Sequence, residues 1–442
     1  MHVGKPHQWL GMGIPAIVVL SCLAMPAVAI SASSIEPREA PQQFILATQL
    51  INQADNPTSI QKGVKWLEQA SKQNYAPALF ELASLYEQGN YVTADMSKAF
   101  DLYEQAAKQG NRDAQYNLGI LYLRKPHNLK LAQYWLEQAA KQKDLEAMYD
   151  LALFHDSADG KSADHQAANF WYNKAAELGF RTAQFELGVR YLQGVVLEKD
   201  TKKAIYWFEQ AAAQEDAAAS FNLGLMYDEG QGQGQAPDLD KAIYWYTKAA
   251  QLGEAGAQYN LGIKYLLGQG VSKDKPKGLA WVRKGAENGN PAAQHMLGYL
   301  YAEGMDIAKD DKQAAHWYEL SAKQGYADGQ FGLAQLFANG QGVSIDQTKA
   351  LEWYGKAAST NHAGAQYNLG TYLAHGIGTH KDLPQAAYWL SLATENHYPN
   401  AQANRDYVLA LLSPAEKQAV NVKLKTEVNP LLPFADKQAS IQ

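Results

Sequence analysis

The chain has 442 residues, of which 47% are hydrophobic and 19% are charged. It can therefore bury a sizeable core and is not a disordered acidic segment. The formal net charge of −6 disfavours nucleic acid as the main partner, and the single cysteine excludes a disulfide within the chain.

The first residues of the chain include an apolar run. The run spans residues 14–29, follows Lys5 and ends in the small residues Ala27–Ala29. A cation, an apolar stretch and a small-x-small site are typical of a secretory signal peptide. We therefore interpret residues 1–29 as a signal peptide and the polar residues 30–41 as a linker. The prolines in the run make it too short for a membrane span, so the mature protein is predicted to be periplasmic or secreted.

The single cysteine, Cys22, lies inside this run and leaves an alternative open. The segment Val19-Leu20-Ser21-Cys22 is similar to a bacterial lipobox, in which the cysteine is acylated and retained. Most residues at 23–28 are apolar, whereas lipoprotein tethers are usually polar, so we favour the soluble form. The mass of the mature protein separates the two forms, because a lipid anchor would keep Cys22 at the new N-terminus.

From residue 42 onward the chain repeats one pattern, a helix, a loop and a second helix. In the copy at Ala183–Gln214, Leu187 and Tyr191 lie on one face of the first helix, and Asp200 can cap the second. One leucine of the first helix recurs at Leu82, Leu118, Leu151, Leu187, Leu223, Leu261, Leu297, Leu333 and Leu369. One tryptophan of the second helix recurs at Trp66, Trp135, Trp171, Trp207, Trp245, Trp281, Trp317, Trp353 and Trp389, with Leu102 in its place once. Since neither helix can bury its apolar stripe alone, the copies are expected to stack, with the tryptophans between helices.

These copies resemble the Sel-one-like repeat (SLR) family, which is related to the tetratricopeptide repeat. The Leu-Gly-x-x-Tyr element and the later Ala-x-x-Trp element carry the resemblance, and the best copies are Ala257–Ala286 and Ala365–Ala393. The resemblance implies an all-α, right-handed α/α superhelical solenoid of about ten helix-pair repeats with capping helices. It also implies a protein-binding scaffold, and bacterial members are often exported and tied to the cell envelope.

The copies at the two ends of the repeat region are degenerate. We place the solenoid at residues 42–412, where a degenerate first helix opens the array and Arg405 replaces the recurring leucine in the last copy. The segment Ser413-Pro414-Ala415-Glu416 is a capping box with proline at the first helical position. It predicts a capping helix at 413–428 that covers the final apolar face. Residues 429–442 are predicted to be a flexible tail.

The first helices carry a second apolar face. With Leu187 at zero on a helical wheel, Phe185 and Val189 fall on the opposite side. In the superhelix that the resemblance implies, first helices line the concave surface, so this face is either an aromatic, peptide-binding trough or is buried by neighbouring helices. The candidate partner-binding residues are Tyr116, Ile120, Phe185, Val189, Phe221, Tyr259, Ile263 and Tyr367.

Three other candidate motifs do not indicate a catalytic, phosphate-binding or metal-binding site. Glycine pairs such as Gly268-x-Gly270 recur between helices without a preceding strand or a Lys-Ser/Thr, so we interpret them as turns and not phosphate loops. Ser59-x-x-Lys62 lacks the companion motifs of a penicillin-binding serine. The scattered histidines, His375 and His380 among them, have no metal-ligand spacing. We therefore predict no catalytic residues, no metal and no cofactor.

The sequence thus predicts an exported, non-enzymatic repeat scaffold that binds a protein or peptide in the bacterial cell envelope. One alternative is a periplasmic enzyme, or a regulator of one, that acts on peptidoglycan or β-lactams. The other is a lipid-anchored docking platform at a membrane, held by Cys22.

Overall fold

The structure is a computed structural model, which describes residues 38–52, 56–124, 128–157, 163–231 and 236–427. Within these ranges the chain forms 22 helices and no strand. The predicted signal peptide, Cys22, most of the linker and the predicted tail lie outside the described residues. None of the described helices is long and apolar enough to span a bilayer.

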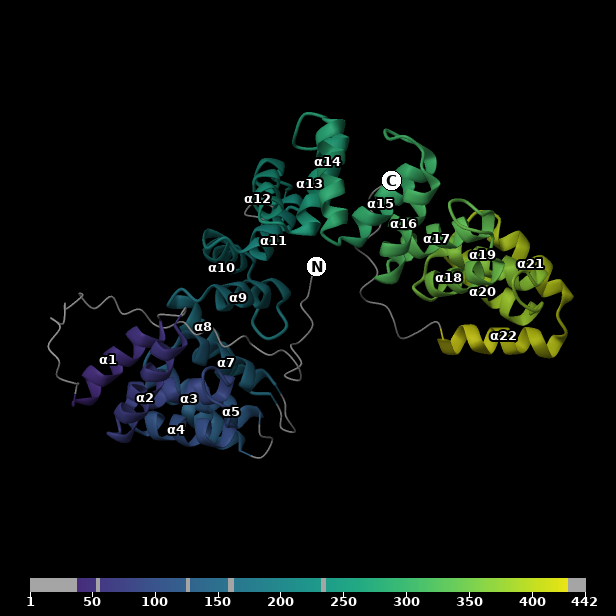
Figure 1. The fold of residues 1–442 in the computed structure, drawn as a ribbon. Coiled ribbons are helices and arrows are strands. Elements are labelled where there is room, and N and C mark those ends of the chain that lie inside the picture. Colours follow the sequence, from purple (N-terminus) through teal and green to yellow (C-terminus); the bar gives the residue numbers. More distant parts are fainter. Residues whose placement is uncertain (1–37, 53–55, 125–127, 158–162, 232–235, 428–442) are drawn as a thin grey trace. The chain divides into compact units, whose positions relative to one another are not determined.

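The chain divides into two compact units, Met1–Ala211 and Ala212–Gln442 (Figure 1). The first unit contains α1 (Ala40–Ile51), α2 (Pro57–Lys72), α3 (Ala76–Gln88), α4 (Met96–Lys108), α5 (Arg112–Arg124), α6 (Leu129–Lys141), α7 (Leu145–Asp156), α8 (His165–Glu177), α9 (Arg181–Gln193) and most of α10 (Thr201–Ala213). The second contains α11 (Ala217–Asp228), α12 (Leu239–Gln251), α13 (Ala255–Leu267), α14 (Lys275–Glu287), α15 (Pro291–Glu303), α16 (Asp311–Lys323), α17 (Ala327–Asn339), α18 (Gln347–Ser359), α19 (Ala363–His375), α20 (Leu383–Glu395), α21 (Ala401–Leu411) and α22 (Pro414–Glu427).

Helices of two kinds alternate along each unit. We call the odd-numbered helices α1 to α21 first helices and the even-numbered helices α2 to α20 second helices. In most repeats a first helix packs against the second helix that follows it, and that second helix packs against the next first helix. Each unit is therefore a solenoid of paired helices, which confirms the predicted all-α architecture.

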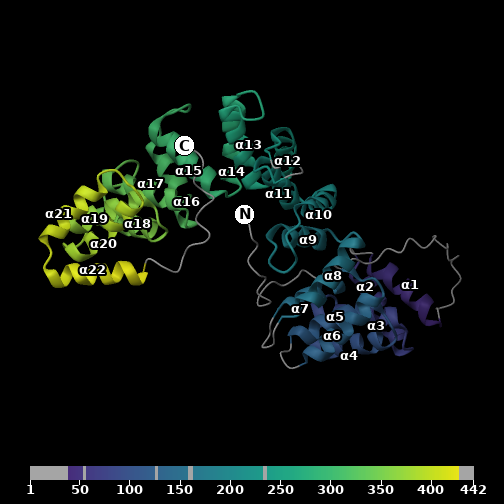
Figure 2. The same ribbon diagram turned by 180° about the vertical axis from the view of Figure 1, so that it is seen from behind.

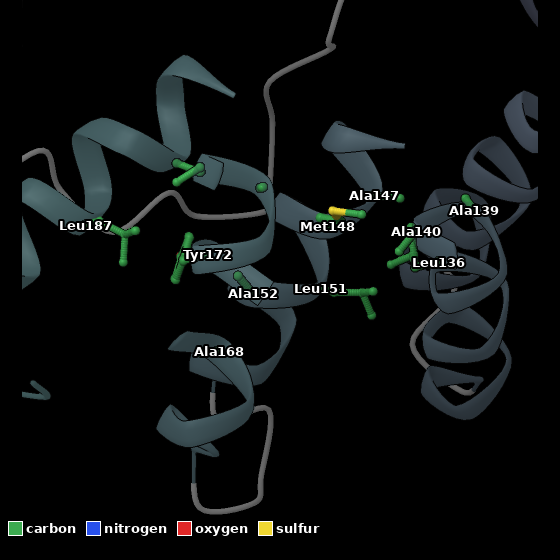
Figure 3. Packing of buried hydrophobic residues seen from close by; sticks show 13 residues of the cluster. Leu136, Ala139, Ala140, Ala147, Met148, Leu151, Ala152, Ala168, Tyr172 and Leu187 are labelled. Carbon is green, nitrogen blue, oxygen red and sulfur yellow. The ribbon is translucent and has the colours of Figure 1, made fainter. Parts of the chain in front are cut away.

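The core of each repeat lies between its paired helices. First helices contribute an alanine and a leucine, as at Ala183 and Leu187, which are fully buried. Second helices contribute alanines and one large side chain, such as Tyr172 in α8. Figure 3 shows one such cluster, whose members come from α6, α7, α8 and α9. Because each cluster draws on consecutive helices, no repeat has a core of its own.

Most of the tryptophans lie at the edge of these cores and not at their centre; Trp135, which is only 8% exposed, belongs to the buried cluster of α3, α4 and α5. Trp207 is half-buried and packs on the cluster that contains Leu187, whereas the next residue, Phe208, is fully buried. Trp317 likewise packs on the core formed by α14 and α15. The prediction that tryptophans pack between helices holds, but the enclosed position is the residue after each of them. The tryptophans join one repeat to the core of the repeat before it.

The predicted helix ends are confirmed. The Oδ1 atom of Asp200 accepts a hydrogen bond from the backbone N–H of Lys203 at 3.0 Å, and its own N–H donates to the carbonyl of Tyr191 at 2.9 Å. Aspartates at the same position cap α12, α14, α16, α18 and α20. At Ser413, the hydroxyl oxygen accepts from the N–H of Glu416, whose carboxylate accepts from the N–H of Ser413 at 2.8 Å. This is the predicted capping box.

The capping helix α22 packs mainly on α20. Its Val420 lies in one buried cluster with Val408 of α21 and with Leu412. Tyr407 and Leu411 of α21 stay exposed. Because only Val420 of α22 is buried, its sequence carries too narrow an apolar stripe to specify this docking site.

A buried glutamine joins each of several repeats to the one before it. The Nε2 atom of Gln258 in α13 donates to the carbonyl of Ala250 in α12 at 3.0 Å, and its Oε1 accepts from Nδ2 of Asn288 after α14 at 2.9 Å. The glutamine thus gives a further donor to a carbonyl in the last turn of a helix, which also accepts from the N–H of Gly253. The same pair of bonds is made by Gln115, Gln294 and Gln366.

Candidate binding surface

The first helices present an aromatic side chain at one repeated position. We call this set the ring row; its members are Phe44, Phe80, Tyr116, Tyr149, Phe185, Phe221, Tyr259, Phe331 and Tyr367, with His295 at the same position in α15. The ring row includes five of the residues predicted from the sequence. Phe44, Phe80, Tyr149 and Phe331 were not among the predicted residues. Reading the position two residues before the recurring leucine would have found them.

Each ring in this row is half-buried. Its inner edge rests on the enclosed side chain of the second helix, as shown by ring-centroid distances of 5.7 Å for Phe185–Phe208 and 6.0 Å for Phe221–Tyr246. Phe331 lies 5.8 Å from Tyr354 in the same way. The core thus fixes one side of each ring, and a second ring covers part of some of them, as His362 does by stacking on Phe331 at 4.5 Å. The edge that stays accessible on each half-buried ring is a preorganised contact.

The predicted aliphatic members of the surface differ from one another. Ile120 and Val189 are half-buried, as the rings are. Ile263 is only 8% exposed, so it offers little contact area. The structure therefore brings seven of the eight predicted residues to the accessible first-helix faces of their units.

The residue after each ring is polar in most repeats, and at two places a polar side chain at this position in the next first helix bonds to a ring hydroxyl. The hydroxyl of Tyr116 in α5 donates to Oδ2 of Asp150 in α7 at 3.0 Å. In the second unit, Nδ2 of Asn404 in α21 donates to the hydroxyl of Tyr367 in α19 at 2.8 Å. Successive first helices are thus tied together beside their rings, which limits the motion of the surface.

In the first unit this position is acidic at Glu81, Asp150 and Glu186 and is asparagine at Asn117. Burial raises the pKa of Asp150 to about 7, although the hydrogen bond from Tyr116 acts against the shift. Burial also raises the pKa of Glu81, and the charge of Asp113 adds to that effect. The second unit carries asparagine at Asn222, Asn260, Asn368 and Asn404. Acidic side chains at this position therefore occur in the first unit and not in the second.

Stability of the first unit is expected to fall with rising pH because of Asp150. Its pKa is higher in the folded chain than the ordinary value of 3.8, so the folded state binds more protons between about pH 4 and pH 7 and loses stability across that range. Asp150→Asn keeps an acceptor for Tyr116 and should flatten this slope, with a gain of at least about 1 kcal/mol at pH 8. Urea unfolding at several pH values measures how the unfolding free energy of the wild type and the variant depends on pH. An unchanged slope would contradict the assignment.

In the second unit a histidine and an aspartate meet on the first-helix side. Nε2 of His362 lies 3.2 Å from Oδ1 of Asp328, and this hydrogen bond, with the nearby His295, lowers the pKa of the carboxyl. Nδ1 of His362 accepts the N–H of Ala365 at 3.0 Å. Both ring nitrogens are therefore occupied, so this pair holds the start of α19 and leaves no free base for catalysis.

The other sequence motifs also have structural roles. Gly268 and Gly270 have positive φ values of 74° and 72° in the turn that ends α13, as predicted for turn residues. Across the described ranges, no group of three histidine, cysteine, aspartate or glutamate side chains could hold a metal ion.

Comparison with known proteins agrees with this repeat structure. The family model of the Sel1 repeat matches most of the chain, at residues 56–75, 76–111, 112–144, 145–180, 182–216, 217–254, 255–290, 291–326, 327–362 and 363–398. A solved protective antigen of uropathogenic Escherichia coli strains, described as displaying an SLR fold, is 26% identical, with a TM-score of 0.68 over 90% of this chain and 89% of that chain. A Sel1 repeat protein of Oxalobacter formigenes is 29% identical over 76% and 86%, with a TM-score of 0.46. None of the curated proteins matches the chain.

Proposed function

Because the chain belongs to the Sel1 repeat family, we propose that it is an exported, non-enzymatic scaffold that binds a protein or peptide partner through the ring row. A Sel1-repeat helical scaffold is typical of protein–protein interaction, and the structure is of this kind. The site of action we propose is the bacterial cell envelope, reached through the signal peptide at residues 1–29. The likeness to an antigen of uropathogenic E. coli is compatible with that site.

The half-buried ring row carries the proposal. Packed helices lie about 8–10 Å apart, and a peptide in the polyproline II conformation advances about 3.1 Å per residue with three residues per turn. Such a peptide, crossing successive first helices, would therefore place every third side chain against a new ring. Fixed rings on this spacing favour a peptide with apolar residues three apart.

Phe221 and Tyr259 test the ring row within the second unit. A photo-cross-linking amino acid at position 221, installed in the native host, should trap a discrete partner, whereas one at the exposed loop position Val195 should not. Against the purified partner, Phe221→Ser with Tyr259→Ser should raise Kd at least about tenfold, which is 1.4 kcal/mol. Far-ultraviolet circular dichroism checks that the variant is folded. Binding that survives in a folded double variant would refute the ring row as the contact surface.

Two further measurements separate the alternatives. Incubation with nitrocefin and with muropeptides should show no turnover, and turnover abolished by one substitution outside the core would favour an enzyme. Cell fractionation with intact mass should find a mature chain that starts after Ala29. A chain that starts at an acylated Cys22 would instead support the lipid-anchored platform.

A further inference from the structure

The second helices expose a ring on the side away from their cores. The residue before the tryptophan is Tyr134 in α6, Phe170 in α8, Tyr206 in α10 and Tyr244 in α12, and these rings are 49–53% exposed. The same position in α20 is Tyr388, which is only 6% exposed. The residue before the tryptophan is thus exposed in four second helices and buried in a fifth, α20.

The covered and open rings have the same local geometry. Tyr388 meets Trp389 edge to face at 5.1 Å and 75°. Tyr206 meets Trp207 at 4.9 Å and 72°, and Phe170 meets Trp171 at 5.0 Å and 78°. Each ring therefore stands in the same orientation on its helix. What differs in α20 is the helix laid over it.

That helix is α22. Figures 1 and 2 both place α22 beside α20, and Val420 joins Tyr388 in one buried cluster against which Leu424 packs. Nζ of Lys423 lies 4.3 Å from the centroid of the Tyr388 ring and donates to Oε1 of Gln385 at 3.1 Å. The chain itself thus shows which ligand this position takes: an amphipathic helix with a narrow apolar stripe and one long cation.

We infer that Tyr134, Phe170 and Tyr206 of the first unit, the outer rings, form a second docking surface for an amphipathic helix of a partner protein with the chemistry of α22. Leu131, one turn before Tyr134, is 36% exposed and extends the apolar area of α6. Three residues before its ring, α8 has Ala167 where α20 has Gln385. At this point on α8 the partner helix would therefore place an apolar side chain. In α10 the residue at the position of Gln385 is Lys203. Its Nζ lies 5.1 Å from the ring centroid of Tyr191 on the first helix α9.

This surface is separate from the ring row, because it lies on second helices and the ring row lies on first helices. A partner that engages both would add the two contacts and gain avidity. Failure of either surface in a binding assay leaves the other unaffected, so the two inferences are tested independently.

The probe is a fluorescent peptide of residues 413–427, held helical by a staple between the exposed positions 415 and 419. The full chain should bind it saturably in fluorescence anisotropy. Tyr134→Ser, Phe170→Ser and Tyr206→Ser combined should weaken binding at least about tenfold, and so should Val420→Asp in the peptide. The matched control is Tyr91→Ser, Tyr299→Ser and Tyr407→Ser, three exposed tyrosines elsewhere, which should leave binding unchanged.

Three results would overturn the inference. The first is no saturable binding to the full chain. The second is binding that persists in the folded outer-ring variant, since the peptide would then bind elsewhere. The third comes from sedimentation equilibrium without peptide: a dimer that the outer-ring variant converts to monomer would make a second copy of the chain the occupant.

Discussion

Phe208→Ala is expected to lower the unfolding free energy by roughly 3–5 kcal/mol, the cost of removing a fully buried aromatic ring. Phe208 is 0% exposed, and its ring supports Phe185 of the ring row at 5.7 Å. The cavity would open between α9 and α10, where the ring lies against Phe185 and Gly188. Urea unfolding followed by circular dichroism, with hydrogen exchange of α9 and α10, measures the loss.

Trp207→Ala is the matched control for Phe208→Ala. The two residues are neighbours on one helix, and the tryptophan is the larger, but Trp207 is half-buried at the edge of the core. Its removal should cost only roughly 1–2 kcal/mol. An equal or larger loss for Trp207→Ala would show that the tryptophan position, and not the residue after it, holds the repeats together.

The repeat architecture could be predicted because each signal is local. A leucine and a tryptophan in fixed phase, an aspartate such as Asp200 before the second helix, and the capping box at Ser413 depend only on neighbours within a few residues. The enclosed position after each tryptophan was less visible. It is filled by leucine, valine, tyrosine or phenylalanine, so its identity varies while its burial does not.

The contacts between repeats could not be predicted in the same way. Gln258 is polar, and such residues are mostly exposed; its partner Ala250 belongs to the preceding repeat and becomes adjacent only after the helices stack. The docking of α22 on α20 could not be predicted for the same reason, since Lys423 bonds to Gln385, which lies 38 residues earlier in the sequence. Half-burial of the ring row also depends on stacking. The sequence alone therefore could not decide whether the second apolar face of the first helices is a peptide-binding trough or is buried by neighbouring helices.

Gly262→Ala is expected to destabilise the second unit by roughly 1–3 kcal/mol. A Cβ at Gly262 would lie 2.9 Å from the carbonyl oxygen of Gly278 and 2.9 Å from the backbone nitrogen of Val282. Because these atoms belong to the backbone of α14, they cannot turn aside as a side chain can, and the two helices would have to separate. The gain in helix propensity, about 1 kcal/mol, is smaller than this cost. Thermal and urea unfolding measure the difference.

Gly224→Ala provides the contrast for Gly262→Ala. The three atoms nearest to a Cβ at Gly224 would all belong to the side chain of Tyr246. In the pair α17 and α18 the chain already has alanine at this position, Ala334, in the same cluster as Tyr354. The ring is therefore expected to shift and the net effect to stay within about 1 kcal/mol of zero. Similar losses at Gly224 and Gly262 would contradict the distinction between side-chain and backbone contacts.

The double variant sharpens this test. A Cβ at Gly278 would lie 2.9 Å from the carbonyl oxygen of Gly262, so the two glycines face each other across α13 and α14. One separation of the helices relieves both clashes. Gly262→Ala with Gly278→Ala should therefore cost less than the sum of the single variants, by at least about 0.5 kcal/mol. Additive losses would mean that the helices do not move as rigid bodies and that each clash is absorbed locally.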